Sequence, residues 1–538
     1  GANGVVRITT KRGEEGKPKI DVSTSFSALT PTKIVEMADS YQYATFHNRM
    51  RKNDETAPQF GEDILEKFRT GSDPIRFPSI RWTDYLMKNS TLQTKSNLNI
   101  SGGTKSVRYF VSLGLMTQGG LFKEFNYDEN FDYSYKRFNY RANLDIDVTP
   151  TTTVTFNVSG IVSNDNKPRT GQGASGMIRN MMQSTPFNAA GIIDDRMVYT
   201  ALDYTDLTLP FRSPQDPMEY LRQGSSNTNL NKLQSDLQVT QKLDFVTPGL
   251  SFRLKGSYNS WFNSSKDVTL ARASYSPVLQ EDNTILYRQL SAATLPSYAE
   301  RNSRGRDWYF EAAFNYNRRF GLNTVGALLL YNQSKVYYPS TYSDIPSGYV
   351  GLVGRVTYDY DNRYMAEFNI GYNGSENFHP DRRFGTFPAG SIGWVLSNEK
   401  FWEPLSRVVN FFKLRASWGL VGNDKVGGDR FMYMADPYTY NDGMFSRWGV
   451  SPAGPKYGYN FGINNGTFLG GYAESSKNNP EVTWEKAFKQ DYGFDLYFLN
   501  SKLRTTFDYY KEHRTGILLR DMTAASFIGY AVRYANLG

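Results

Sequence analysis

Apolar and polar residues alternate with a period of two along most of the chain. Between Phe252 and Asn259, apolar or small residues at even positions alternate with basic and polar residues at odd positions. The same alternation recurs in Val107–Met116, Leu352–Tyr360 and Phe412–Leu420. It predicts β-strands with one apolar face. The runs have about 10–14 residues, against about 5–6 in strands of soluble sheets, so they suit tilted membrane strands.

The connections between these runs alternate between short and long. Tight turns are expected at Ser101–Thr104, Thr149–Thr151, Val246–Gly249, Gly321–Asn323, Asp359–Asn362 and Asn500–Lys502. Long polar stretches separate them at Ala28–Leu92, Asn164–Leu230, Ser265–Arg304 and Val421–Trp484. Because this asymmetry is typical of outer-membrane barrels, we predict an all-β fold, an antiparallel transmembrane β-barrel. A soluble β-solenoid is the alternative, but it needs a repeat of about 20–50 residues, which is not found.

Aromatic residues and short helices complete this prediction. Aromatic side chains that flank the strands would form the two girdles at the membrane interfaces: Tyr337, Tyr338, Tyr358, Tyr360, Tyr364, Trp394 and Trp418. Helices are predicted inside the long loops, over Thr32–Arg51, Glu62–Thr70 and Gly176–Gln183.

Composition narrows the class of protein further. The 538 residues include 15% aromatic residues and no cysteine, which excludes disulfides, cysteine-ligated metal centres and thiol catalysis. The mean hydropathy of −0.55 and the absence of long apolar runs exclude a helical membrane protein. A net charge of +8 without a stripe of basic residues favours anionic lipid headgroups over nucleic acid as the counter-charge. The first residues, GANGVVRITT, lack Met and a signal sequence, so we interpret Gly1 as an internal residue.

Motifs for catalysis and metal binding are weak. The three histidines, His47, His379 and His513, lie far apart in the sequence, and no zinc-protease or nucleophile-elbow motif occurs. Gly171–Gly176 matches a dinucleotide fingerprint but does not follow a strand within a βαβ unit, so a flexible loop is expected. Asn423–Asp429 has oxygen ligands without EF-hand spacing, which favours a turn. We therefore expect no enzymatic activity, no cofactor and no metal.

One loop, Asp424–Glu474, is dense in aromatic, Asn and Gly residues. Stacking faces beside amide groups suit sugar rings or extended peptides, although self-packing of a large loop accounts for them equally well. The residues expected to contact substrate or a lid are Tyr438, Tyr440, Trp448, Tyr457, Tyr459, Phe461 and Tyr472.

Longer blocks of sequence resemble a known family. Gly1–Ile20 resembles the end of the plug and the first strand of SusC/RagA-type TonB-dependent outer-membrane transporters. Gly354–Phe378, Phe384–Trp402 and Phe412–Asp424 resemble that family's most recognisable block, and Asn479–Leu519 resembles the block that follows. The blocks run from end to end in the family's order. Tyr372–Ser375 departs mildly from the usual Arg-Xaa-Asp-Gly-Ser.

The resemblance implies active import of oligosaccharides or oligopeptides across the outer membrane of a Gram-negative bacterium. It implies two protein partners, TonB and a SusD-like surface lipoprotein that covers the barrel mouth. Residues 1–13 would end the plug domain, and residues 14–538 would form a barrel that is incomplete at its C-terminal end. The alternatives are a siderophore or cobalamin receptor without a lid, a passive porin, and an outer-membrane hydrolase.

Strand counting adds an expectation about closure. About fifteen strands are predicted, whereas plugged barrels of this kind use about 22. An open sheet would expose unpaired backbone groups to hydrocarbon, at a cost of several kcal/mol each. We therefore expect a partial wall with two open edges, in which Asp21–Ser27 pairs with strands that lie beyond Gly538 in a longer polypeptide.

Overall fold

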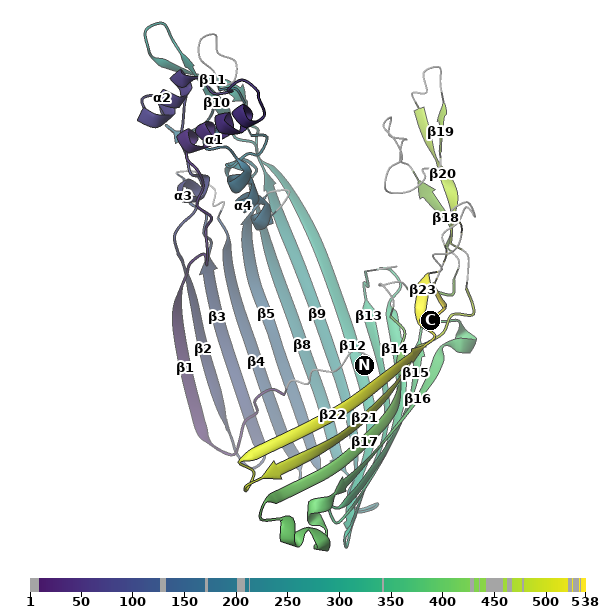
Figure 1. Ribbon diagram of the computed structural model, residues 1–538. Coiled ribbons are helices and arrows are strands. Elements are labelled where there is room, and N and C mark those ends of the chain that lie inside the picture. The colour runs from purple at the N-terminus through teal and green to yellow at the C-terminus, as the bar shows by residue number, and fades with distance from the viewer. Residues whose placement is uncertain are drawn as a thin grey trace.

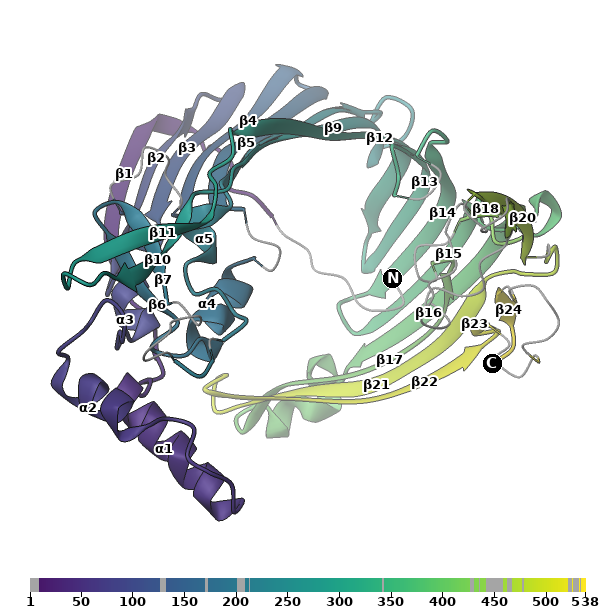
Figure 2. The same ribbon diagram turned by 90° about the horizontal axis from the view of Figure 1, so that it is seen from above.

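The computed structural model shows one large curved sheet (Figure 1). The structure describes residues 9–125, 132–169, 173–200, 209–211, 213–340, 343–425, 430–434, 436–441, 458–461, 467–476, 479–520, 525, 532 and 534–538. The sheet has 15 strands, and every neighbouring pair is antiparallel. Seen from above, it curls around most of a circle (Figure 2). The predicted architecture and strand number are confirmed.

The strands of the large sheet follow the chain as a meander. They are β1 (Gly16–Leu29), β2 (Thr91–Gly103), β3 (Val107–Gly119), β4 (Ser134–Thr149), β5 (Thr152–Pro168), β8 (Ser225–Lys242), β9 (Leu250–Thr269), β12 (Ser297–Phe320), β13 (Asn323–Tyr337), β14 (Ser347–Tyr360), β15 (Tyr364–Ser375), β16 (Phe384–Val395), β17 (Val409–Asn423), β21 (Glu485–Phe498) and β22 (Leu503–Thr515). The order within the sheet ends at β1 and β22, so these strands form its two edges.

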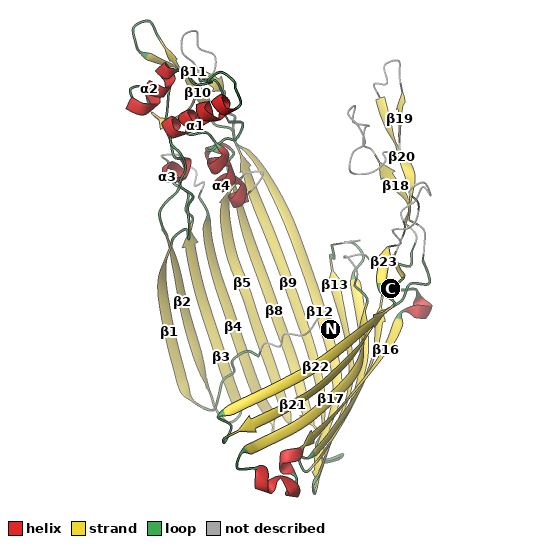
Figure 3. Cartoon of the chain, in the orientation of Figure 1, coloured by secondary structure: helices red, strands yellow, loops and turns green. Residues whose placement is uncertain are grey.

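The two rims of the sheet differ as predicted. The six predicted tight turns join strands at one rim, here called the short-turn rim, and the long stretches emerge at the other, the long-loop rim (Figure 3). One short-turn connection was missed, because Leu396–Val408 folds into two 3-10 helices, η2 (Leu396–Asn398) and η3 (Lys400–Leu405). In that connection Trp402 donates its indole N–H to the carbonyl of Val409 at 3.0 Å.

Several strands are longer than the sequence indicated. β12 has 24 residues and β9 has 20, and their pairing continues to Ser297 and Thr269. The neighbouring β13 pairs with β12 only from Arg306 onward. The upper part of the β9–β12 hairpin is polar, with residues that also suit a loop, so alternation alone could not show that the strands continue.

Helices and small strands gather above the long-loop rim, in a group called here the loop head. It contains α1 (Ser40–Asn53), α2 (Glu62–Thr70), α3 (Trp82–Leu86), α4 (Gly173–Gln183), α5 (Glu219–Arg222) and a four-stranded sheet of β6 (Ala189–Ile193), β7 (Arg196–Tyr199), β10 (Ser274–Leu279) and β11 (Ile285–Ser291). Within the described residues, no helix is long and apolar enough to cross a membrane.

Two of the three predicted helices start at residues other than those predicted. The first begins at Ser40 rather than Thr32, because Asp39 caps it through a bond from the backbone N–H of Gln42 at 2.8 Å. The helix α2 has the predicted bounds. The helix α4 begins at Gly173, so the described part of Gly171–Gly176 is helical and not the flexible loop that was expected.

Two apolar clusters hold the loop head together. In one cluster, Ala44 of α1 and Phe68 of α2 pack against Phe60 and Phe187. The other packs Trp82 of α3 with Met177 and Met181 of α4 and with Tyr220 of α5. Trp82 also donates to the carbonyl of Thr185 at 2.8 Å. The long loops are therefore ordered by cores of their own.

Candidate functional site

Inner and outer faces of the sheet can be assigned from the segment before β1. Figure 2 shows the described part of this segment, Thr9–Glu15, on the inner side of the curved sheet. The amide of Asn143 donates to the carbonyl of Lys11 at 2.6 Å, so Asn143 faces inward. Directly opposed residues of neighbouring strands share a face. The register from Asn143 therefore places Asp236 and Tyr309 inside, and Leu144 and Phe310 outside.

The inner face is polar and crossed by ion pairs. Arg253 pairs with Glu311 at 2.6 Å. Arg415 reaches Asp508 at 2.5 Å and, more distantly, Asp491 and Asp495, both at 3.4 Å. The outer face carries apolar side chains such as Leu329, Val356 and Phe368, each more than half exposed. This is the polarity of a barrel that encloses an aqueous interior and faces hydrocarbon outside.

The segment Thr9–Glu15, here called the tether, is fixed to the inner wall. Besides the Asn143 bond, Arg12 pairs with Asp145 at 2.7 Å. A Cβ on Gly13 would lie 2.3 Å from the carbonyl oxygen of Tyr109 and 2.7 Å from that of Gly102, so only glycine fits there. The sequence predicts that the plug ends at residue 13, within the tether, but it does not reveal these contacts.

A polar cavity of about 660 Å³ lies in the loop head. Asn180, Asn188, Tyr199, Asp216, Glu219, Arg222, Ser274 and Ser291 are among its lining residues. These residues come from distant segments without a shared motif, so sequence reasoning missed the cavity. The arrangement offers amide, hydroxyl and charged groups to a ligand rich in hydroxyl or amide groups.

The acidic residues of this cavity are held in place. Asp216 accepts a bond from the Tyr199 hydroxyl at 2.8 Å and pairs with Arg222 at 3.3 Å. Glu219 accepts bonds from the amides of Asn180, at 2.7 Å, and Gln223, at 2.8 Å. Burial, followed by the charge of Asp216, raises the pKa of Tyr199 well above its ordinary value. The phenol therefore stays protonated at neutral pH and remains a donor.

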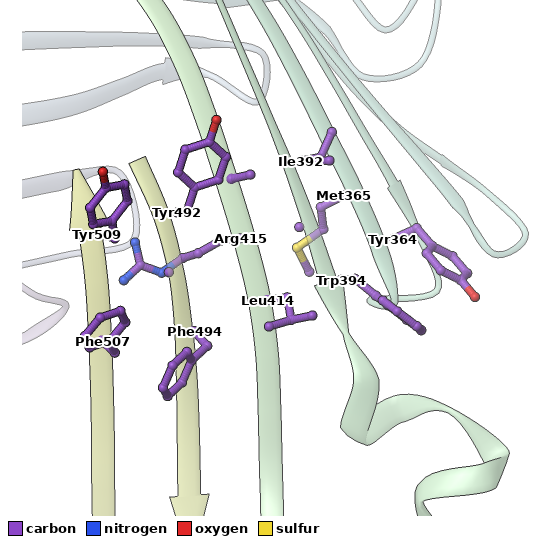
Figure 4. Close-up of a pocket in the computed structure, with 13 residues that line it drawn as sticks. Tyr364, Met365, Ile392, Trp394, Leu414, Arg415, Tyr492, Phe494, Phe507 and Tyr509 are labelled. Carbon is purple, nitrogen blue, oxygen red and sulfur yellow. The ribbon is translucent and has the colours of Figure 1, made fainter. Parts of the chain in front are cut away.

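A larger hollow, of about 880 Å³, lies on the outer face (Figure 4). Its lining includes outward-facing Ile392, Leu414, Tyr492, Phe494 and Phe507. At one end Tyr364 stacks on Trp394, with ring centres 6.2 Å apart. Because the hollow is apolar and faces away from the interior, it suits hydrocarbon and not cargo.

The predicted aromatic contact residues fall partly within the described chain. Tyr438 and Tyr440 lie in β18 (Asp436–Asn441), Tyr459 and Phe461 in β19 (Gly458–Phe461), and Tyr472 in β20 (Thr467–Ser476). These strands form one small sheet in which Tyr440 opposes Tyr472. Trp448 and Tyr457 lie outside the described residues. The structure thus places five of these residues on neighbouring strands, and their contact with cargo or a lid stays a prediction.

The root of this loop is firmly anchored. Arg430, 8% exposed, pairs with Glu376 at 2.8 Å and donates to the carbonyl of Ile345. Asp424, the first carboxylate of the predicted turn, accepts a bond from Ser375 at 2.6 Å, and Val426–Asp429 lie outside the described residues. Among the residues whose positions are described, no cluster of metal-ligating side chains occurs.

Comparisons with known proteins agree with the resemblance seen in the sequence. No family model matches the chain. Two curated proteins share 24% identity with it: TonB-dependent receptor P3 of Formosa agariphila, over 100% of this chain, and TonB-dependent receptor SusC of Bacteroides thetaiotaomicron, over 95%. The matched regions are 49% and 48% of those proteins, so the chain spans about half their length.

A solved structure of a transporter has a fold similar to that of this chain. The RagAB peptide importer in its closed-closed state superposes with a TM-score of 0.69 and 17% identity, over 100% of this chain and 59% of the matched chain. A likeness at this identity shows the fold alone. The sequence matches and the fold together confirm the predicted resemblance. Along its whole length, the chain is similar in sequence and in fold to the SusC/RagA type of TonB-dependent outer-membrane transporters.

Proposed function

We propose that the protein imports oligosaccharides or oligopeptides across the outer membrane and draws its energy from TonB. The observation that carries the proposal is the combination of a polar, tethered interior with a sequence match to SusC over 95% of this chain. The structure of RagAB is described as that of a peptide importer, which supports peptides as one cargo class. No catalytic constellation is needed, because the work is capture, enclosure and release.

The parts of the chain have separate roles in this proposal. Residues 1–13 end a plug that blocks leakage, and residues 14–538 form most of the barrel wall. The open edges of β1 and β22 are closed by further strands of a longer polypeptide, since a membrane barrel must satisfy every edge group. The loop head, above the long-loop rim, faces the outside of the cell, where a SusD-like lipoprotein covers the mouth.

Affinity purification tests the partner. The full-length protein, solubilised from outer membranes in mild detergent, is expected to bring down one surface lipoprotein at near-equal stoichiometry. The Phe46→Ser variant tests whether an exposed ring of α1 takes part in this binding. Phe46 is 64% exposed, so its replacement leaves the apolar core intact. Purification without any lipoprotein, from cells that express both proteins, would count against the lid.

The aromatic loop is expected to contribute to cargo or lid binding. Replacing Trp448 and Tyr459 by alanine removes two aromatic side chains, and an aromatic contact is worth about 1 kcal/mol. Two such contacts amount to about 2 kcal/mol, so binding of the natural cargo should weaken by roughly 30-fold for the double variant, as measured by isothermal titration with the purified protein. Unchanged affinity, with normal barrel assembly, would assign these residues to self-packing of the loop.

A further inference from the structure

Three cationic side chains lie together on the outer face near the long-loop rim. Arg304 and Arg306 are on β12 and Lys335 is on β13. The register that places Tyr309 inside places Arg304, Arg306 and Lys335 on the same face as Phe314 and Leu329, which is the outer one. The three cations therefore face away from the interior and from any cargo that passes through it.

Two tyrosine rings position these cations. The Arg306 guanidinium lies 4.3 Å from the centre of the Tyr337 ring, and the Lys335 ammonium lies 5.3 Å from the same centre. The Arg304 guanidinium lies 4.9 Å from the centre of the Tyr338 ring. Attraction between a cation and the face of an aromatic ring holds such side chains without neutralising their charge.

Nearby carboxylates are engaged elsewhere. Within the described ranges, no ion pair joins any of the three cations to an acidic side chain. Asp307 faces inward, where it accepts a bond from Asn259 at 2.7 Å. Glu300, higher on β12, accepts a bond from Ser264 at 3.0 Å. Glu300 keeps its charge but lies four residues above Arg304, so none of the three cations has an ion-pair partner among the described residues.

A hollow of about 380 Å³ adjoins the cations. Arg304, Arg306 and Tyr338 line it together with the polar residues Ser260 and Asn231. Its remaining lining includes apolar Val162, Leu233 and Phe262, all on the outer face. Tyr258 and Trp308 oppose each other just below, at the level where the aromatic girdle of a membrane barrel is expected. The hollow is therefore cationic toward the rim and apolar toward the middle of the strands.

We propose that this site binds the phosphorylated headgroup of an outer-leaflet glycolipid. The guanidinium groups and the ammonium hold phosphate oxygens by charge-assisted hydrogen bonds, and an acyl chain lies along the apolar residues. The proposal rests on the outer-membrane placement argued above. A soluble anion alone would not use the apolar half of the hollow, which is why we commit to a lipid.

Lipid retention by the full-length protein tests the proposal. The probes are bis-phosphorylated lipid A, its dephosphorylated form and inorganic phosphate, each added to purified protein in detergent and followed by native mass spectrometry. The variant carries Arg304→Gln, Arg306→Gln and Lys335→Gln. The matched control is Arg318→Gln, because Arg318 is also an outward cation over a ring, Phe320 at 4.7 Å, but lies at the short-turn rim.

The wild type and R318Q are expected to bind phosphorylated lipid A, and the triple variant is expected to bind it roughly 100-fold more weakly. Equal binding by the triple variant would overturn the site, and equal binding of dephosphorylated lipid would overturn the role of phosphate. Binding of inorganic phosphate without lipid would replace the lipid by a free anion. In the same preparations, heat-modifiable electrophoretic migration reports whether the barrel is folded, and co-purification reports whether the lipoprotein is bound. If both are normal while lipid binding is absent, this inference fails and the proposed function stands.

Discussion

Replacing Gly13 by valine is expected to detach the tether from the inner wall. The new Cβ would come within 2.4 Å of both the carbonyl oxygen and the nitrogen of Tyr109. These are backbone atoms of a strand paired on both sides, so they cannot move away. The tether must therefore shift, which breaks the Lys11–Asn143 bond and the Arg12–Asp145 pair. The plug that we propose to end here would then lose its attachment to the wall.

Ion conductance in planar bilayers measures this loss. The wild-type full-length protein should be nearly silent, and the G13V variant should show frequent openings. Gly256→Val is the control, because that strand glycine has no heavy atom near its ideal Cβ position. Silent G13V channels would show that the tether does not help to seat the plug.

Replacing Phe187 by alanine should unfold much of the loop head and leave the barrel wall intact. Phe187 is fully buried, and its ring centre lies 5.5 Å from that of Tyr43, 5.6 Å from that of Phe60 and 5.7 Å from that of Phe68. Truncating a buried phenylalanine costs about 3–5 kcal/mol. This cost falls on a small local core, so local opening is the expected response.

Hydrogen exchange resolved by mass spectrometry localises that effect. Amides of α1 and α2 should exchange much faster in F187A, whereas amides of β8 and β9 should keep their protection. The control, Phe46→Ala, removes an exposed ring from the same part of the structure and should change neither set. Faster exchange in the strands as well would mean that loop head and wall unfold together.

The strands were predictable because each carries its own signal. Outward Phe252 and Leu254 must be apolar and inward Arg253 and Lys255 polar, so alternation alone reveals the strand. Apolar periodicity alone does not locate the start of α1, because the cap at Asp39 fixes it. Polar strand extensions such as Ser297–Arg301 look like loops, because polar residues occupy both faces there and the apolar alternation is lost.

The candidate sites were harder to predict, because they depend on contacts between distant segments. The loop-head cavity joins Asn180, Glu219 and Ser291 across more than a hundred residues, and no local pattern connects them. The fit of Gly13 against Tyr109 likewise becomes visible only when the tether is seen against the strand. The aromatic loop was found from its composition, but composition cannot separate cargo contact from self-packing.

The central claim, energised import through this barrel, is tested most directly by uptake into living cells. Cells that express the full-length protein with the proposed lipoprotein partner are given fluorescent malto-oligosaccharides or fluorescent oligopeptides. The fluorescence inside the cells is followed before and after an uncoupler collapses the proton gradient. Energised cells are expected to accumulate one of the two cargo classes, and accumulation should stop when the uncoupler is added. Cargo entry that continues unchanged without the gradient would show a passive pore and contradict the account.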